Sequence, residues 1–253
     1  MIWTFPASTM RGNAVVTGGV VYLANEPQNT SVQHIHALRA SDGSQLWDAP
    51  LPQDCGTALS GAVDQGMTFA ACSGYNLGPN SNGSQFSPGV YSLRASDGSM
   101  LWHSTTNGQP SIGAAGAGLL YVSLYNKNAA GALVALDETS GAVRWQVANG
   151  GGGPVFDGTT VYAQILIGQP QLSASSSTDL AAFSASSGAA LWTYPETNKR
   201  LQSLPVIAGG VVYLIVNEQV VAISAADGSV LWRSPALGSE HVGLDGLSVV
   251  TGG

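Results

Sequence analysis

Short apolar runs alternate with glycine-containing turns along the whole chain, and one eleven-residue pattern recurs five times. The copies read ALRASDGSQLW (37–47), SLRASDGSMLW (92–102), ALDETSGAVRW (135–145), AFSASSGAALW (182–192) and AISAADGSVLW (222–232). Each places an apolar residue nine positions before its Trp and a Gly four positions before it. Asp-Gly or Ser-Gly between two apolar runs is typical of a hairpin. Each copy therefore predicts two antiparallel strands joined by a tight turn, with the second strand ending at the Trp.

A second pattern precedes each copy and contains one aromatic residue at a constant place. It reads GGVVYL (18–23), QGMTFA (65–70), AGLLYV (117–122), GTTVYA (158–163) and GGVVYL (209–214). An apolar stretch and a Gly-containing turn stand before it, which predicts a second hairpin. One repeat is thus four strands, A to D, with the aromatic residue in B and the Trp in D. No helical period is sustained anywhere.

Repeats of this length and strand content predict an all-β fold, a β-propeller of four-stranded antiparallel blades. Successive Trp residues are 44, 55, 43, 47 and 40 positions apart. We expect one domain over 1–253, with repeats at about 6–50, 51–105, 106–148, 149–195 and 196–235. An indole at one place in every blade predicts docking between blades, by Trp3, Trp47, Trp102, Trp145, Trp192 and Trp232.

The ends of the chain carry partial blades in this interpretation, over 1–5 and 236–253. Trp3 stands one repeat before Trp47, at the position that the Trp takes in a D strand. SVVTGG (248–253) repeats the A-strand sequence AVVTGG (14–19). The sequence therefore predicts a fragment of a propeller with six to eight blades, or a ring left open between Trp3 and the strand at 247–251.

Length varies almost only between strands B and C. The B aromatic stands 25, 33, 24, 30 and 19 positions before the Trp of its own repeat. Loops on a rigid scaffold are where binding residues concentrate, so we expect a ligand face there. Its candidate residues are Tyr75, Asn76, Asn82 and Phe86 in the longest insertion (73–89), with Tyr125 and Asn126 in the next repeat. The alternative for any one loop is a flexible segment of Gly, Ser and Asn that binds nothing.

The Trp pattern, preceded by GGVVYL, resembles the repeat of pyrroloquinoline-quinone (PQQ)-type propellers. That family contains quinoprotein dehydrogenases, the outer-membrane assembly lipoprotein BamB and sensor domains of bacterial kinases. The resemblance implies, for the dehydrogenases, PQQ over the axis, a calcium ion, a catalytic Asp and often a disulfide between adjacent cysteines. This chain has no Cys-Cys pair, and the Asp of the family's Trp motif is matched only by Asp137. No catalytic residue can be carried over.

Charge narrows the choice of partner. Only 9% of the residues are charged, eight are Lys or Arg, and the net charge is −7. This composition offers no basic stripe for nucleic acid. No apolar run approaches the roughly 20 residues of a membrane span. The low charge and the family resemblance predict an extracytoplasmic protein.

Three clusters have candidate chemistry. His34 and His36 are two apart, so on a strand they share one face and could bind a metal; no third ligand stands nearby in the sequence, and a solvated or loop-edge pair is the preferred interpretation. Cys55 and Cys72 flank the A–B hairpin of the second repeat and could form a disulfide in an oxidising compartment, or remain two buried thiols. NGGGGP (149–154) is expected to be a connection between repeats, since no phosphate-binding motif follows it.

The sequence as a whole predicts a non-catalytic propeller, a protein-interaction scaffold or ligand-sensing domain that uses the face with the long B–C loops. We expect a protein partner or a small ligand there, and no metal or cofactor. A fragment of a PQQ-dependent quinoprotein dehydrogenase is the alternative, and PQQ and calcium belong only to it.

Overall fold

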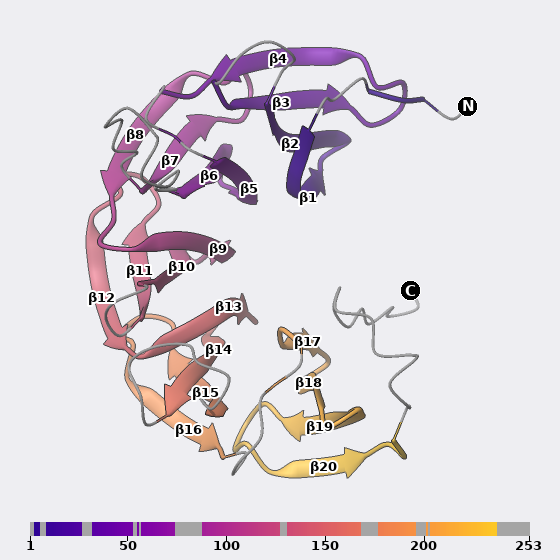
Figure 1. Ribbon diagram of the computed structural model, residues 1–253, viewed down its shortest axis with the longest axis vertical. Coiled ribbons are helices and arrows are strands. Elements are labelled where there is room, and N and C mark those ends of the chain that lie inside the picture. The colour runs from indigo at the N-terminus through magenta and orange to yellow at the C-terminus, as the bar shows by residue number, and fades with distance from the viewer. Residues whose placement is uncertain are drawn as a thin grey trace, which may run out of the picture. The chain divides into compact units, whose positions relative to one another are not determined.

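A computed structural model of the chain has an all-β architecture, which confirms the predicted fold class (Figure 1). The structure describes residues 3–5, 9–26, 32–52, 55, 57–73, 88–126, 131–167, 177–195, 201 and 203–236. These residues form twenty strands in five sheets of four antiparallel strands, and each sheet is one sequence repeat. No helix occurs among them, and hence none that could span a membrane.

Each blade is a meander in which strands A to D pair in chain order. The first blade is β1 (Thr9–Thr17), β2 (Val20–Glu26), β3 (His34–Arg39) and β4 (Gln45–Pro50). The second is β5 (Thr57–Asp64), β6 (Met67–Ser73), β7 (Gly89–Arg94) and β8 (Met100–Thr105). The third is β9 (Gln109–Gly116), β10 (Leu119–Tyr125), β11 (Ala132–Asp137) and β12 (Val143–Ala148). The fourth is β13 (Gly150–Phe156), β14 (Thr160–Ile167), β15 (Ser177–Ser184) and β16 (Ala190–Tyr194), and the fifth is β17 (Val206–Ala208), β18 (Val211–Val216), β19 (Gln219–Ser224) and β20 (Val230–Arg233).

The described chain divides into two compact units, 1–120 with 136–142, and 121–135 with 143–253. The first unit has a core of Tyr22, Ile35 and Trp47 with Tyr91 and Leu93. The second is centred on residues of the fourth and fifth blades, among them Tyr162, Leu180, Leu214, Val221 and Ile223. The expectation of one domain over 1–253 stays a prediction. So does the open ring, because residues 247–251 lie outside the described part of the chain.

Each D strand continues beyond its Trp, which corrects the expectation that it ends there. Trp47 is the third residue of β4, and it pairs with Ala37 while Gln45 pairs with Leu38. Leu46 is therefore an extra residue, a β-bulge that re-aims the side chains around it. The second, fourth and fifth blades shift register at the same place. The residues after the Trp differ from repeat to repeat, so the repeated pattern ends at the Trp although the strand continues.

Five indoles bind the following repeat through one common contact. The Nε1–H group donates to the carbonyl oxygen of the fourth residue of that repeat's Trp pattern, at 2.7–2.9 Å. The pairs are Trp3 with Ala40, Trp47 with Ala95, Trp102 with Glu138, Trp145 with Ala185 and Trp192 with Ala225. A buried indole donor needs such an acceptor.

The Gly of the Trp pattern has a second task that the sequence interpretation missed. Gly188 has φ +70°, as the turn requires, but it also lies under the Trp145 ring. A Cβ atom there would stand 2.7 Å from Cε3 of Trp145. Gly43, Gly98, Gly141 and Gly228 hold the same place under Trp3, Trp47, Trp102 and Trp192. The residue is Gly for the turn and for the neighbouring indole.

The glycine run at 149–154 is mostly strand rather than a connection. Residues 150–156 form β13, the first strand of the fourth blade. A Cβ on Gly150 would lie 2.2 Å from the backbone nitrogen of Leu133. The close approach of two backbones explains the glycine there.

Candidate functional site

The meander brings the B–C connections and the links between repeats to one end of each sheet, because neighbouring strands are antiparallel. We call this the loop-bearing end. Its B–C connections span 27–33, 74–88, 126–131, 168–176 and 217–218 in the five blades. The last is a two-residue turn in which Asn217 and Glu218 both have positive φ, as a type I′ hairpin requires. A blade therefore closes with two residues, and the longer connections are additions to it.

Two strands of the first blade place three ionisable side chains at this end. His34 and His36 come from the start of β3, and Asp48 from the end of β4, where it pairs in register with His36. His34 Nδ1 lies 2.6 Å from Asp48 Oδ1, and His36 Nδ1 lies 3.6 Å from the same oxygen. The two imidazoles stack with centroids 5.9 Å apart. The structure thus supplies the third group that the sequence did not reveal.

His36 is buried and held in one orientation. It is 4% exposed, and its Nε2 lies 2.7 Å from Oδ1 of Asn25, at the end of β2. The phenyl ring of Phe5 packs against its ring at 5.2 Å. Burial lowers the pKa of His36, against the opposing effect of Asp48. The expectation of a solvated or loop-edge pair is wrong for His36, because β3 turns this face toward Phe5 rather than toward water.

The B–C connection of the first blade is closed at its base by a buried polar contact. Gln33 Nε2 donates to Glu26 Oε2 at 3.3 Å, and Gln33 is 1% exposed. The carbonyl oxygen of Gln33 also accepts from the Leu51 amide at 2.8 Å. The connection therefore starts and ends in a fixed place.

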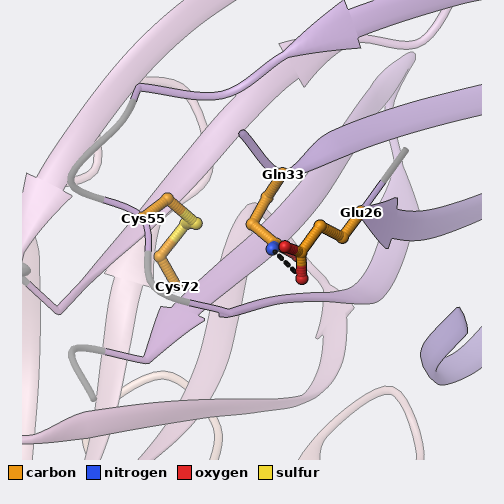
Figure 2. Close-up of a disulfide and its surroundings, with 4 residues drawn as sticks. All are labelled: Glu26, Gln33, Cys55 and Cys72. Atoms are coloured by element: carbon orange, nitrogen blue, oxygen red, sulfur yellow. Dashed lines mark hydrogen bonds between the residues drawn. A yellow bond between two sulfur atoms is a disulfide. The ribbon is translucent and has the colours of Figure 1, made fainter. Parts of the chain in front are cut away.

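A disulfide joins Cys55 and Cys72 in the second blade, with their Cα atoms 5.1 Å apart (Figure 2). The Glu26–Gln33 pair lies in its surroundings. Cys55 belongs to the link between β4 and β5, and Cys72 is the penultimate residue of β6. Both are buried. The bond ties the link between repeats to the strand that leads into the longest connection, 74–88.

The predicted ligand face is only partly placed. Tyr75, Asn76, Asn82 and Phe86 lie outside the described residues. Tyr125 ends β10 and is 40% exposed, and Asn126 follows it, partly buried. The insertion at 73–89 and Tyr125 belong to different compact units, so their combination into one face stays a prediction.

The A strands offer few of the side chains that PQQ and calcium would need. PQQ is a tricarboxylate that calls for cationic partners, and calcium calls for several oxygen ligands. The A strands, which line the axis of propellers, contain only two charged residues, Arg11 and Asp64. Arg39 and Arg94 pair instead with Asp42 and Asp97 on exposed C–D turns.

Comparison with known proteins agrees with the repeat. The family model of the outer membrane protein assembly factor BamB matches residues 1–148 and 129–252, which together cover nearly the whole chain. The chain belongs to this family. Among curated proteins, none is similar enough in sequence to count as a relative.

Two solved structures show the same fold in larger proteins. A europium-containing methanol dehydrogenase is 14% identical, with a TM-score of 0.63 over 92% of this chain and 52% of its own. The quinohemoprotein alcohol dehydrogenase of Comamonas testosteroni is 15% identical, with a TM-score of 0.61 over 90% of this chain and 43% of its own. BamB of Moraxella catarrhalis is 18% identical, with a TM-score of 0.47 over 89% of this chain and 76% of its own. The chain spans about half the length of the two dehydrogenases.

Proposed function

We propose that this BamB-family propeller is a non-catalytic extracytoplasmic scaffold that binds a protein segment at its loop-bearing end. The family's description as an outer membrane protein assembly factor supports an outer-membrane protein as the partner. The disulfide is compatible with an oxidising compartment outside the cytoplasm.

The proposal rests on the B–C connections, which differ widely in length although the bases of two of them are held in place. The fifth blade closes with Asn217 and Glu218 alone, whereas the second extends its connection over 74–88. The base of that connection is tied by Cys55 and Cys72, and the base of the first blade's connection is closed by Gln33. A long insertion anchored on a rigid sheet is the usual design of a binding loop.

Replacing residues 74–88 with Asn-Glu, the connection of the fifth blade, tests the proposal. The probe is a fluorescent ten-residue peptide of alternating polar and apolar residues, the pattern of an outer-membrane β-strand. We expect the replacement to weaken binding at least about tenfold, the loss of roughly 1.4 kcal/mol of contact energy. The same replacement of 168–176, the connection of the fourth blade, should leave binding unchanged if the contact is confined to the connection of the second blade. Equal affinity of the loop-replaced and wild-type proteins, at an unchanged unfolding midpoint, would contradict the proposal.

A PQQ-dependent dehydrogenase is the second candidate, favoured by the fold that the chain shares with the two alcohol-oxidising enzymes. Calorimetric titration with PQQ and calcium chloride separates the two. The scaffold proposal expects no heat of binding, and saturable binding at micromolar or tighter affinity would replace it with the second candidate.

A further inference from the structure

We propose that His34, His36 and Asp48 form a binding site for a divalent transition-metal ion of the zinc type, with one coordination position left open. The proposal is independent of the peptide-binding function, and it departs from the sequence-based expectation of no metal. Nitrogen and oxygen atoms of these residues all lie within 4.8 Å of one another, on one end of the first blade.

The spacing of the donor atoms suits a tetrahedral ion. Zinc binds imidazole nitrogen and carboxylate oxygen at about 2.0–2.2 Å, so two ligand atoms of a tetrahedral site stand about 3.3–3.6 Å apart. His36 Nδ1 and Asp48 Oδ1 are already 3.6 Å apart. His34 Nδ1 and Asp48 Oδ1, at 2.6 Å, share a hydrogen bond and must separate by about 0.7 Å. Their side chains are 17% and 35% exposed, so a small rotation of either is sterically open.

The second observation is the buried nitrogen of His36. Nε2 of His36 faces the side-chain amide oxygen of Asn25, Oδ1, which can only accept a hydrogen bond. Nε2 therefore carries the proton of the neutral imidazole, and Nδ1 keeps a lone pair. Nδ1 is buried and has no hydrogen-bond partner among the described residues. It is aimed at the Asp48 oxygen. A buried acceptor without a partner costs free energy, and a metal ion at this place would satisfy it.

Asn25 contacts the nitrogen of His36 that would not bind the ion, as outer-sphere residues do in metal sites. Histidine ligands commonly donate their second N–H to an oxygen that fixes the tautomer and the ring orientation. Phe5 packs against the His36 ring. The least adaptable ligand is thus positioned before any ion arrives.

The donor set selects the kind of ion. Two imidazoles and one carboxylate suit zinc, cobalt, nickel or copper better than calcium or magnesium, which prefer oxygen ligands alone. Three protein ligands leave a fourth position for water or for a donor atom of another molecule. Because Asp48 is exposed, that position is accessible from solvent. The cysteines do not compete for the ion, since they are joined in the disulfide.

Zinc binding to the untagged, non-reduced protein tests the proposal. Calorimetry with zinc chloride should give one ion per chain, and cobalt chloride should give the visible absorption of a tetrahedral nitrogen–oxygen site. Asp48→Asn and His34→Gln keep side-chain size at exposed or half-exposed positions, and each should weaken zinc binding at least about tenfold. Asn25→Ala, which touches no metal ligand atom directly, should weaken it by about 10–100-fold.

His103→Gln is the matched control. His103 is exposed and stacks on Tyr91 in the second blade, with ring centroids 4.2 Å apart, so its replacement should leave zinc affinity unchanged. Far-ultraviolet circular dichroism and the unfolding midpoint show whether each variant is folded. Absence of zinc binding by the wild-type protein, or binding that Asp48→Asn and His34→Gln leave unchanged, would overturn the proposal.

Discussion

Trp145 and Trp232 occupy the same place in two copies of one sequence pattern, yet their environments differ. Trp145 is 9% exposed, and Trp232 is 48% exposed. Both contact the tyrosine of their own blade at nearly the same distance, 6.0 Å to Tyr121 and 6.1 Å to Tyr213. Trp145 also donates a hydrogen bond to the carbonyl oxygen of Ala185 and packs against Gly188. Among the described residues, Trp232 has no such acceptor and no such glycine. A repeat therefore does not bury its own Trp, and burial comes from the next repeat.

The largest effect should come from removing the docked indole. Trp145→Ala should lower the free energy of unfolding by about 3–5 kcal/mol, because it empties a packed site and leaves a carbonyl without its donor. Trp232→Ala should cost less than about 1 kcal/mol, as exposed positions do. Urea unfolding followed by circular dichroism measures both. Equal losses in the two variants would break the comparison.

The next effect concerns the surface that receives the indole. Gly188→Ala should cost about 2–4 kcal/mol, since it adds a strained left-handed conformation to a clash with Trp145. Gly210 has φ +74°, but a Cβ added to it would meet no atom within 4 Å, so Gly210→Ala carries the conformational cost alone, about 1–2 kcal/mol. The excess of the first loss over the second measures the docking contact. If the two losses were the same, the glycine would serve the turn only.

The smallest effect distinguishes one junction from the rest. The indole of Trp102 donates its hydrogen bond to the backbone carbonyl of Glu138, and the other repeats have Ala at that position. Burial, with the Asp64 carboxyl nearby, raises the pKa of Glu138 to about 7. A raised carboxyl pKa means that the folded state binds the proton more tightly, so stability is present at low pH and is lost as the pH rises through about 7.

Glu138→Gln should abolish that loss, which we expect to be on the order of 1–3 kcal/mol between pH 5 and pH 8. Urea unfolding at several pH values gives the difference between variant and wild type. The pKa of His36 is lowered, so its own effect has the opposite sign, stability falling as the pH falls below 6.5. His36 is present in both proteins and cancels in the difference. A difference independent of pH would contradict the assignment to Glu138.

The sequence predicted most of the strands and their order because most of them carry a repeated apolar pattern. It did not predict Asp48 beside His36, and the reason is the β-bulge at Leu46. A count across the hairpin without the bulge places Trp47, not Asp48, opposite His36, whereas the actual partners are His36 with Asp48. The role of Gly188 was missed because its turn alone already explains a glycine. The strand at Gly150 was missed because a glycine run has no apolar alternation to reveal it.

The contact between consecutive repeats also bears on how such a chain can evolve. The donor is an indole near the end of the unit. The acceptor is a backbone carbonyl, that of Ala in four repeats and of Glu138 in the third, with a glycine three residues after it. Donor and acceptor are different surfaces, so the contact is heterologous and points from one unit to the next. Every copy encodes both surfaces within eleven residues. A duplication of one whole repeat in the gene therefore inserts a unit that already fits the neighbour on either side. The contact surfaces need no further substitutions after such an event, and the connections at the other end of the strands are free to diverge.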